Sequence, residues 1–232
     1  MRGRRGGLTL LAVAATMAGL ILIVVAVSAQ VRAPQPPRSV GRIDPAAPAS
    51  SAAASPSTGS SGSSAATGKA PQPASPPVRI SIPSIGVHSK VIPIGLAQDG
   101  TLAVPQPGPN LDRAAWFKNS PTPGQPGPAI IEGHVDSTQG PSVFFKLGAL
   151  RPGATIHVLR KDGIETVFTV NAVRDFPKSA FPTSLVYGGT DLSRPLLRLI
   201  TCSDFNAAIR HHTGNEVVFA HLTATHRPSA RH

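Results

Sequence analysis

Seven short segments rich in Val, Ile, Leu and Thr constrain the fold of this chain more than any other feature of its sequence. Turn signals such as Gln98-Asp99-Gly100 and Pro152-Gly153 separate them, and this alternation is typical of strands in an all-β domain. Helical periodicity is weak, with short candidates near 141–147 and 181–187. The apolar segments are VRISIPSIGV, SKVIPIGL, GPAIIEGHV, ATIHVLR, TVFTVNAV, PLLRLITC and EVVFAHL.

These segments lie between residues 78 and 225, a length that suits one domain. Short strands have edges that must be covered, so we expect a closed or nearly closed β-barrel of seven or eight strands. The pair Asp162-Gly163 predicts a hairpin between two of the segments, with a type I′ turn that uses the positive φ angles these residue types tolerate.

A charge-free apolar run, Leu8–Val27, precedes this domain. Its twenty residues would cross a bilayer as one helix of ~30 Å. Three arginines come before the run and fewer basic residues follow it closely, so the positive-inside rule predicts a cytoplasmic N-terminus (1–7), a membrane anchor (8–27) and an extracellular domain. The alternative is a cleaved signal peptide, because Val27-Ser28-Ala29 resembles a cleavage site. Both alternatives export the rest of the chain.

Residues 28–77 are predicted to form a disordered linker. They contain no aromatic side chain and few large aliphatic ones, so no core would offset the entropy of ordering them. As a flexible tether the segment would reach roughly 40 Å, which suits a wall layer above a membrane. At the other end of the chain, residues 226–232 are predicted to form a flexible basic tail.

The formal net charge of +11 is concentrated in the terminal segments. Residues 78–225 contain thirteen basic and ten acidic residues, a net charge of +3. The whole chain has one Trp and one Tyr, so it lacks the aromatic residues, interleaved with basic ones, that stack on nucleic-acid bases. The pattern therefore disfavours nucleic acid as a partner.

Cys202 is the only cysteine of the chain. It follows an apolar run, so we expect it at the carboxyl end of a buried strand, where a rigid element presents its side chain. Two alternatives are open: a small buried hydrophobic residue, or a catalytic nucleophile. A free thiol is only about 3% thiolate at pH 7, so a nucleophile requires a basic neighbour.

His134 is our candidate for that neighbour. It ends the run IIEGH, and Gly133 before it allows close approach by a substrate or by neighbouring backbone. Attack on a carbonyl also needs a donor for the oxyanion, and Arg210 is the only arginine between Cys202 and the C-terminal tail. A solvated surface arginine is the alternative for Arg210.

Three stretches in order, GHVDS with GPSVFFKLGALRPG, then LRLITCSDF, then Arg210 ahead of EVVFAHL, resemble the sortases. The stretch WFKNSPTPGQPGPAIIEGHVDS is similar to the actinobacterial group called class F. The resemblance covers the domain from VRISIPSIGV onwards. It implies an eight-stranded sortase β-barrel with short helices, residues 78–225 as the catalytic domain, and a cysteine transpeptidase with His134, Cys202 and Arg210 as its catalytic residues.

The resemblance also implies the reaction and its partners. Cys202 would attack the threonine carbonyl of a sorting signal similar to LPxTG and form a thioester, which an amine of the cell wall, such as that of a peptidoglycan precursor, would resolve. Arg210 would stabilise the oxyanion and His134 would protonate the leaving amine. No metal or other cofactor is expected, because no set of ligands has the spacing of a zinc site.

Thr201, Asp136 and Ser203 are candidate substrate-binding residues. A plain strand threonine and a turn-capping aspartate are the alternatives for the first two. The competing hypothesis for the whole chain is a non-catalytic, membrane-tethered wall-binding module that has a sortase-like barrel. Selective alkylation of a native thiol would favour the enzyme.

Several positions depart from the family pattern. Ser203 and Asp204 follow the cysteine where the family often has glycines, and an acid so near a thiolate would raise the pKa of the thiol. Gly214 stands where an aspartate is common. Thr213 replaces an arginine that is often found in this stretch, which leaves Arg210 as the candidate for oxyanion stabilisation.

Overall fold

The computed structural model describes residues 33–36, 40–41, 43, 70–188 and 191–227. They belong to the second of two compact units, residues 33–232. The predicted membrane anchor, 8–27, and most of the predicted linker and basic tail lie outside the described residues. Within the part that is described, no helix is long and apolar enough to cross a membrane.

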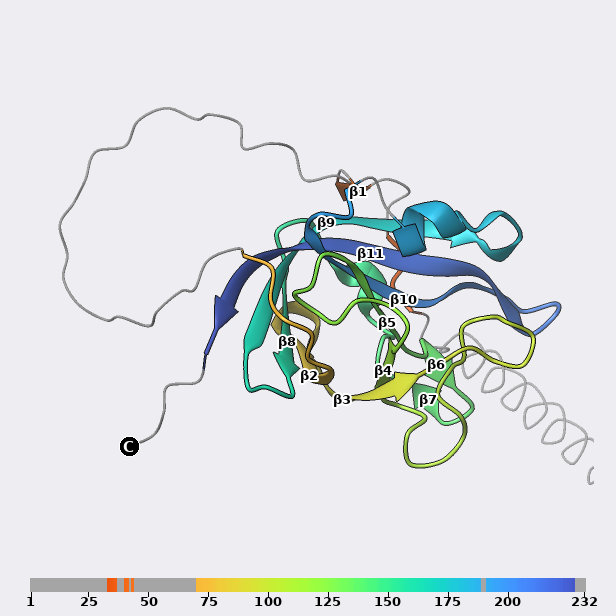
Figure 1. Cartoon of the computed structure of the whole chain (residues 1–232). Helices are drawn as coiled ribbons and strands as arrows, with labels where there is room; N and C mark the ends of the chain where they lie inside the picture. Colours follow the sequence, from red (N-terminus) through yellow and green to blue (C-terminus); the bar gives the residue numbers. More distant parts are fainter. Residues whose placement is uncertain (1–32, 37–39, 42, 44–69, 189–190, 228–232) are drawn as a thin grey trace, which may run out of the picture. The chain divides into compact units, whose positions relative to one another are not determined.

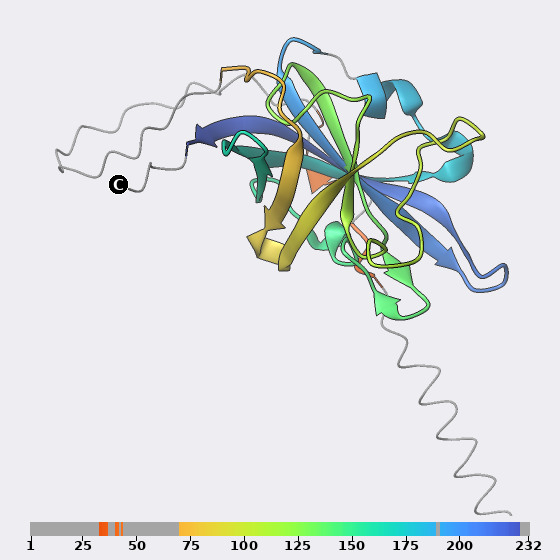
Figure 2. The same ribbon diagram turned by 60° about the horizontal axis from the view of Figure 1, so that its bottom comes forward.

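Eight strands close into a barrel (Figures 1 and 2). Their order is β9-β11-β10-β5-β4-β3-β2-β8, and β8 pairs again with β9. The predicted mainly β, eight-stranded barrel is therefore confirmed. Its strands are β2 (Pro77–Ile82), β3 (Val87–Ile94), β4 (Ala114–Phe117), β5 (Gly127–Glu132), β8 (Thr155–Arg160), β9 (Glu165–Pro177), β10 (Pro195–Asn206) and β11 (His211–His226).

The apolar segments of the sequence did not predict the barrel strand β4. It contains only Ala-Ala-Trp-Phe and has little β-branched character.

The remaining elements are short. Few helical turns are present, as expected. The elements outside the barrel are β1 (Val40–Gly41), β6 (Asp136–Ser137), β7 (Gly140–Pro141), η1 (Pro83–Ile85), η2 (Leu147–Ala149), η3 (Lys178–Ala180) and the π-helical turn η4 (Ser184–Gly188).

Two pairs of barrel strands are parallel, β5 with β10 and β3 with β4, and the other barrel pairs are antiparallel. Parallel neighbours end at the same edge of a sheet. The carboxyl ends of β5 and β10 therefore point to the same end of the barrel, where β10 continues for six residues past the end of β5. The hairpin between β10 and β11 projects beyond this part of the barrel in both ribbon views (Figures 1 and 2).

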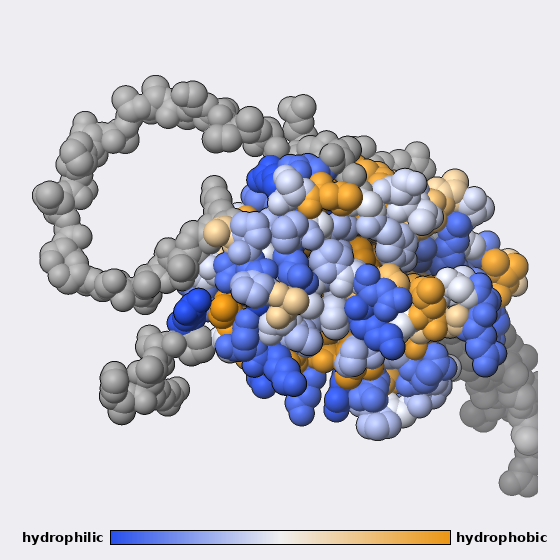
Figure 3. Space-filling model, in the orientation of Figure 1, coloured by the Kyte–Doolittle hydropathy of each residue, from blue (hydrophilic) through white to orange (hydrophobic). Residues whose placement is uncertain are grey.

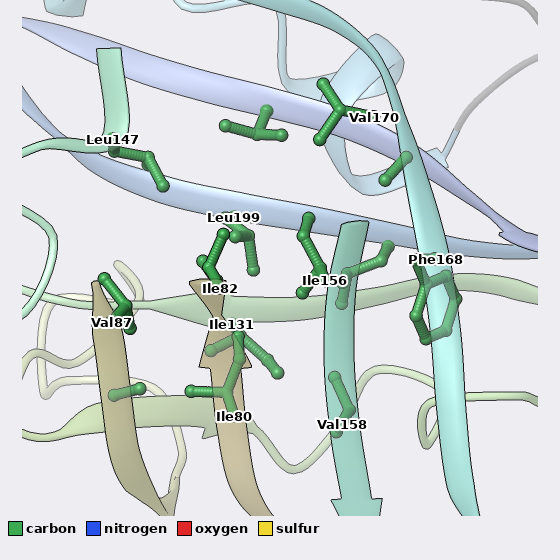
Figure 4. Packing of buried hydrophobic residues seen from close by; sticks show 14 of the residues in the cluster. Ile80, Ile82, Val87, Ile131, Leu147, Ile156, Val158, Phe168, Val170 and Leu199 are labelled. Carbon is green, nitrogen blue, oxygen red and sulfur yellow. The ribbon is translucent and has the colours of Figure 1, made fainter. Parts of the chain in front are cut away.

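The barrel interior is filled by alternate residues of the strands, as the period of two in strand side chains requires. Ile80, Ile131, Ile156, Phe168 and Leu199 are fully buried and point toward one another (Figure 4). Burying each such side chain stabilises the fold by ~1.5–3 kcal/mol. The outward surface in Figure 3 is mainly hydrophilic, and its apolar residues form small separate areas.

A second apolar cluster lies on the opposite face of β10 and β11. Ile200, Val217 and Phe219 are buried there, and Phe181 and Tyr187 from the segment containing η3 and η4 pack against them. Because side chains alternate along β10, Cys202 shares this face with Ile200. The segment that follows β9 therefore covers the side of the sheet that carries the thiol.

The predicted hairpin at Asp162-Gly163 is present between β8 and β9, but the type I′ turn was wrong. Gly163 has φ +80°, whereas Asp162 is not among the described residues with positive φ. The Asp162 carboxylate instead accepts hydrogen bonds from the Ile164 amide and the Arg160 side chain. With these bonds Asp162 does not adopt a positive φ, and Gly163 alone supplies the positive φ of the turn.

Parts of the predicted linker pack on the barrel. Val40–Gly41 pairs with Ala172 and Val173 of β9 as strand β1, and Gln72 N donates to Gly124 O at 2.8 Å. The guanidinium of Arg160, 1% exposed, donates to the carbonyl oxygens of Pro73 (2.6 Å) and Pro123 (2.9 Å). A buried cation thus fastens the segment before β2.

Candidate active site

His134 and Cys202 lie at the same level, just past the end of the pairing between β5 and β10. In the parallel pair of β5 and β10, Glu132 lies opposite Ile200. His134 follows Glu132 by two residues, and Cys202 follows Ile200 by two. Neighbouring strands lie ~4.8 Å apart. The imidazole and the thiol therefore start from adjacent positions at one end of the barrel.

Gly133 and Thr201 join the two strands at this end. Gly133 N donates to Ile200 O at 3.1 Å, and the Thr201 hydroxyl donates to Gly133 O at 2.8 Å. A Cβ atom at Gly133 would lie 2.6 Å from Cγ1 of Val143 and 2.9 Å from Cδ2 of Phe144. Side chains of the following loop, not backbone, occupy the space at Gly133, and the predicted approach by a substrate stays a prediction. Thr201 is buried, and its predicted contact with substrate stays a prediction.

The His134 imidazole is half-buried and is oriented by a loop distant in sequence. Its Nε2 atom lies 2.8 Å from the carbonyl oxygen of Pro105. Because a carbonyl only accepts hydrogen bonds, Nε2 carries a proton in this contact. Nδ1 is then the nitrogen that can take up and release a second proton.

The half-buried Cys202 thiol experiences opposing influences. Burial raises the pKa of the thiol above its ordinary value, and the negative charges of Asp136 and of Glu132, when that group is ionised, raise it further. The charge of Lys178 and a hydrogen bond from its side chain lower the pKa. The sequence interpretation missed Lys178, which lies 24 residues before the cysteine in a segment without any motif.

Arg210 lies in the exposed turn between β10 and β11, with φ +50°. Asn206 pairs with His211 at the base of the turn, four residues beyond the pair of Cys202 with Asn215. At ~3.3 Å per residue, this base is roughly 13 Å from Cys202. The fold brings His134 to the level of Cys202 but places Arg210 farther along the hairpin, and the catalytic role of Arg210 stays a prediction.

Two of the departures from the family pattern are partners across the sheet. Ser203 lies opposite Gly214, and a Cβ atom at Gly214 would collide with the Ser203 hydroxyl oxygen and lie 3.2 Å from carboxylate oxygens of Asp175 and Asp204. The side chain of Ser203 is thus matched by the absence of a side chain at Gly214. Ser203 is buried and donates to Asp175, so its predicted role in substrate binding stays a prediction.

The Asp204 carboxyl interacts with Asp175. Burial raises the pKa of Asp175, and Asp204 raises it further, whereas the hydrogen bond from Ser203 lowers it. A positive φ of 52° at Asp204 bends the strand directly after the Cys202-Ser203 pair. The carboxyl groups that raise the pKa of the Cys202 thiol are those of Glu132 and Asp136, whereas the sequence had predicted this effect for Asp204.

Asp136 links the loop after His134 to the hairpin. Its Oδ1 atom lies 3.0 Å from Nε2 of His212 on β11, and the His212 ring contacts the Phe205 ring at a centroid distance of 5.2 Å. Asp136 therefore connects the loop after His134 to β11. Its predicted contact with substrate stays a prediction.

Glu132 is a second residue that the sequence interpretation missed. Its side chain is 7% exposed, its Oε1 atom finds no hydrogen-bond partner among the described residues, and burial raises its pKa to about 8. At neutral pH it is therefore mainly an uncharged acid beside the thiol. In the sequence, Glu132 looks like an ordinary polar residue at the end of a strand, and no local pattern of residues marks it as part of the site.

A surface pocket of about 380 Å³ between η1, β3 and residues 141–146 does not include Cys202 in its lining. Among the described residues, no group of three or more His, Cys, Asp or Glu side chains is placed to bind a metal ion.

A closed barrel that presents a lone thiol and an imidazole at one end of the sheet defines a class of small β-barrel proteins with a candidate cysteine nucleophile. Residues 80–223, more than half of the chain, match the Sortase domain family. The chain therefore belongs to the sortase family, whose members are generally cysteine transpeptidases.

Solved structures similar to this chain are sortases of several classes. No curated protein matches it. Sortase A of Listeria monocytogenes has 18% sequence identity (66% of this chain and 92% of that chain covered, TM-score 0.49). Sortase A of Corynebacterium diphtheriae has 20% identity (64% and 61% covered, TM-score 0.49), and sortase C-1 of Actinomyces oris has 19% identity (62% and 72% covered, TM-score 0.49).

Proposed function

We propose that this chain is a cysteine transpeptidase that cleaves an LPxTG-like sorting signal after threonine and transfers the cleaved protein to an amine of the cell wall. The observation that carries the proposal is the equal level of His134 and Cys202 beyond the paired strands β5 and β10. A nucleophile on one rigid strand and an acid–base group just past the end of the adjacent strand support covalent catalysis.

In the first half of the reaction, the Cys202 thiolate forms a bond to the threonine carbonyl carbon, and the electron pair of the C=O double bond moves to the oxygen. The oxyanion then collapses and the C–N bond to the next residue breaks. The departing amine takes a proton from His134, and a thioester remains on Cys202.

In the second half, the amine acceptor attacks the thioester carbon. His134 takes the proton of the attacking amine, the new amide bond forms, and the C–S bond breaks to return the Cys202 thiolate. The protonated Nε2 held by Pro105 leaves Nδ1 as the atom for both proton transfers. Arg210 remains the sequence candidate for the positive charge at the oxyanion.

We also propose membership of the class F group, on the stretch from Trp116 to Ser137 that resembles it, and a single membrane-spanning anchor at 8–27 with the barrel outside the cell. The charge-free apolar run and the basic residues before it support the anchor. A sorting-signal protein and a peptidoglycan precursor or other wall amine are the proposed partners, and no cofactor is required.

The test uses the full chain in detergent, incubated with LPxTG-type peptides and followed by intact mass spectrometry. A thioester adduct or cleavage after threonine in the wild type, and neither in Cys202→Ala, is expected. The opposite result, no adduct with any peptide of the panel and a Cys202 that is alkylated only after unfolding, would favour the non-catalytic wall-binding module.

A further inference from the structure

Glu132 carries a buried carboxyl group that the fold itself does not use. The side chain is 7% exposed, and its Oε1 atom has no hydrogen-bond partner among the described residues. Native proteins keep few buried polar atoms of this kind, because each one is costly when it is left without a partner. The carboxyl group is therefore a candidate for a partner that a bound molecule supplies.

The carboxyl group lies on the same face of the sheet as the Cys202 thiol. Glu132 on β5 pairs with Ile200 on β10, and Cys202 follows Ile200 by two residues. Because side chains alternate along a strand, all three residues point to one face. One strand spacing of ~4.8 Å and two residues of ~3.3 Å each separate Glu132 from Cys202, which is roughly 8 Å in total.

Aromatic side chains cover this face beside Glu132. The turn η4 packs against β5. The ring of Tyr187 in η4 lies 6.5 Å from the ring of Phe117 on β4 and 6.3 Å from that of Phe181. Burial raises the pKa of Tyr187, and the charge of Glu132 raises it further, which agrees with this placement. The carboxyl group thus lies among mainly apolar side chains.

The carboxyl group has the hydrogen-bonding capacity that a peptide group requires. Burial raises the pKa of Glu132 to about 8, so at neutral pH the group has one O–H donor and a carbonyl acceptor. A sorting signal that binds between the sheet and the aromatic side chains loses water from its backbone, and its peptide groups then need partners. An extended peptide spans ~3.3–3.6 Å per residue, so about two residues separate a group at Glu132 from one at Cys202.

We propose that the Glu132 side chain binds a backbone amide of the sorting signal, about two residues from the cleaved bond, and so positions the threonine carbonyl at Cys202. This inference rests on the proposed transpeptidase function. The carbonyl oxygen of the carboxyl group accepts the amide N–H, and its O–H donates to a peptide oxygen. Glu132 is a substrate-binding residue in this arrangement and takes no part in bond making or breaking.

The first experiment measures peptide binding without turnover. The full chain with Cys202→Ala, in detergent, is titrated into fluorescein-labelled LPxTG-type peptides and followed by fluorescence anisotropy. Glu132→Gln keeps a donor and an acceptor, so its affinity should stay close to that of the Cys202→Ala parent. Glu132→Met has a similar length and no polar oxygen, and should weaken binding roughly ten- to hundredfold. Equal affinities of Glu132→Met and the parent would overturn the inference.

Glu216→Met is the matched control. Glu216 is also buried, and its Oε1 atom also has no hydrogen-bond partner among the described residues. It shares the inward face of β11 with Val218, away from the thiol. Glu216→Met should therefore bind peptide like the parent, and a loss as large as that in Glu132→Met would contradict a specific contact at Glu132.

The second experiment identifies the amide. A series of peptides replaces one backbone N–H at a time by an ester oxygen. At the contacted position, the ester should weaken binding to the parent and have little further effect in Glu132→Met, because the two changes remove the same hydrogen bond. Additive losses at every position of the series would rule out the contact.

Stability measurements separate binding from folding. Glu132→Met removes an unpaired buried carboxyl group, so its unfolding free energy should be no lower than that of the parent. If the methionine does not fit, Glu132→Ala takes its place in both binding experiments, since it adds no volume. No binding of any peptide by the parent would overturn the proposed function together with this inference, whereas binding that is indifferent to Glu132 would overturn this inference alone.

Discussion

His134 and Cys202 occupy equivalent positions, each two residues past the pair Glu132 and Ile200 that ends the parallel pairing of β5 and β10. The relationship depends on parallel strands, because in an antiparallel pair the two carboxyl ends lie at opposite edges of the sheet. The barrel therefore supplies the proximity that the proposed nucleophile and its proposed acid–base partner require.

Removal of the imidazole should affect catalysis far more than removal of its neighbour. His134→Ala is expected to lower kcat/KM by ~10²–10⁴-fold, the usual contribution of a positioned acid–base group. His212→Ala, which breaks the contact with Asp136 but leaves His134 in place, should cost less than about tenfold. Steady-state peptide cleavage measures both. Equal losses would contradict the assignment of His134 alone as the acid–base group.

Gly133→Ala should destabilise the protein by ~1–3 kcal/mol and displace His134. Its new methyl group would meet Val143 at 2.6 Å and Phe144 at 2.9 Å, and overpacking of this kind forces backbone shifts. Urea denaturation measures the effect. Gly188→Ala is the matched control, since no atom lies within 4 Å of the added carbon there. Equal stability of the two variants would contradict the close packing.

Gly214→Ala and Ser203→Gly should be coupled. The alanine methyl group collides with the Ser203 hydroxyl, so Gly214→Ala alone should be less stable than in the Ser203→Gly background, with a coupling energy of about 1 kcal/mol. A double-mutant cycle of unfolding free energies tests this. Additive effects would mean that the two departures from the family pattern are independent.

Glu216→Gln should stabilise the protein at alkaline pH. Glu216 is 2% exposed, and burial followed by the charge of Asp175 raises its pKa to about 8, against 4.5 for a free side chain. Between these pH values the folded state retains a proton that the unfolded state has lost, so this group makes stability fall as pH rises from 4.5 to 8.

The glutamine removes that loss. The variant should differ little from the wild type at pH 5 and exceed it by about 2–4 kcal/mol at pH 8, as measured by denaturant titration. A Glu216→Gln variant that follows the wild type at both pH values would show that this carboxyl is ionised in the fold.

Arg160→Lys should cost about 2–3 kcal/mol, because a lysine cannot reproduce the fork that donates to Pro73, Pro123 and Asp162. Residues 70–76 should also become more susceptible to proteolysis. The exposed Arg79→Lys on β2 is the control, with an expected change within about 0.5 kcal/mol. Protease resistance of residues 70–76 in Arg160→Lys would contradict the fastening role.

Local patterns predicted the elements that depend on local physics. Alternating apolar residues indicated most of the barrel strands, and the apolar run before Cys202 placed the cysteine near the end of a strand. The strand β4 was missed because Ala114 and Ala115 contribute little apolar bulk, although both are buried. The turn at Asp162 was misjudged because Arg160 holds the aspartate side chain.

By itself, the sequence determined that the chain forms a small β-barrel with one cysteine, and its ordered motifs indicated the family. Only the tertiary structure decided which groups surround that cysteine. Glu132 and Lys178, which are distant from Cys202 in the chain, act on the pKa of its thiol, and Arg210 lies in a turn whose base is four residues beyond Cys202 along the hairpin. Such contacts depend on strand register and barrel closure, which sum over many weak interactions and leave no local signature in the residues concerned.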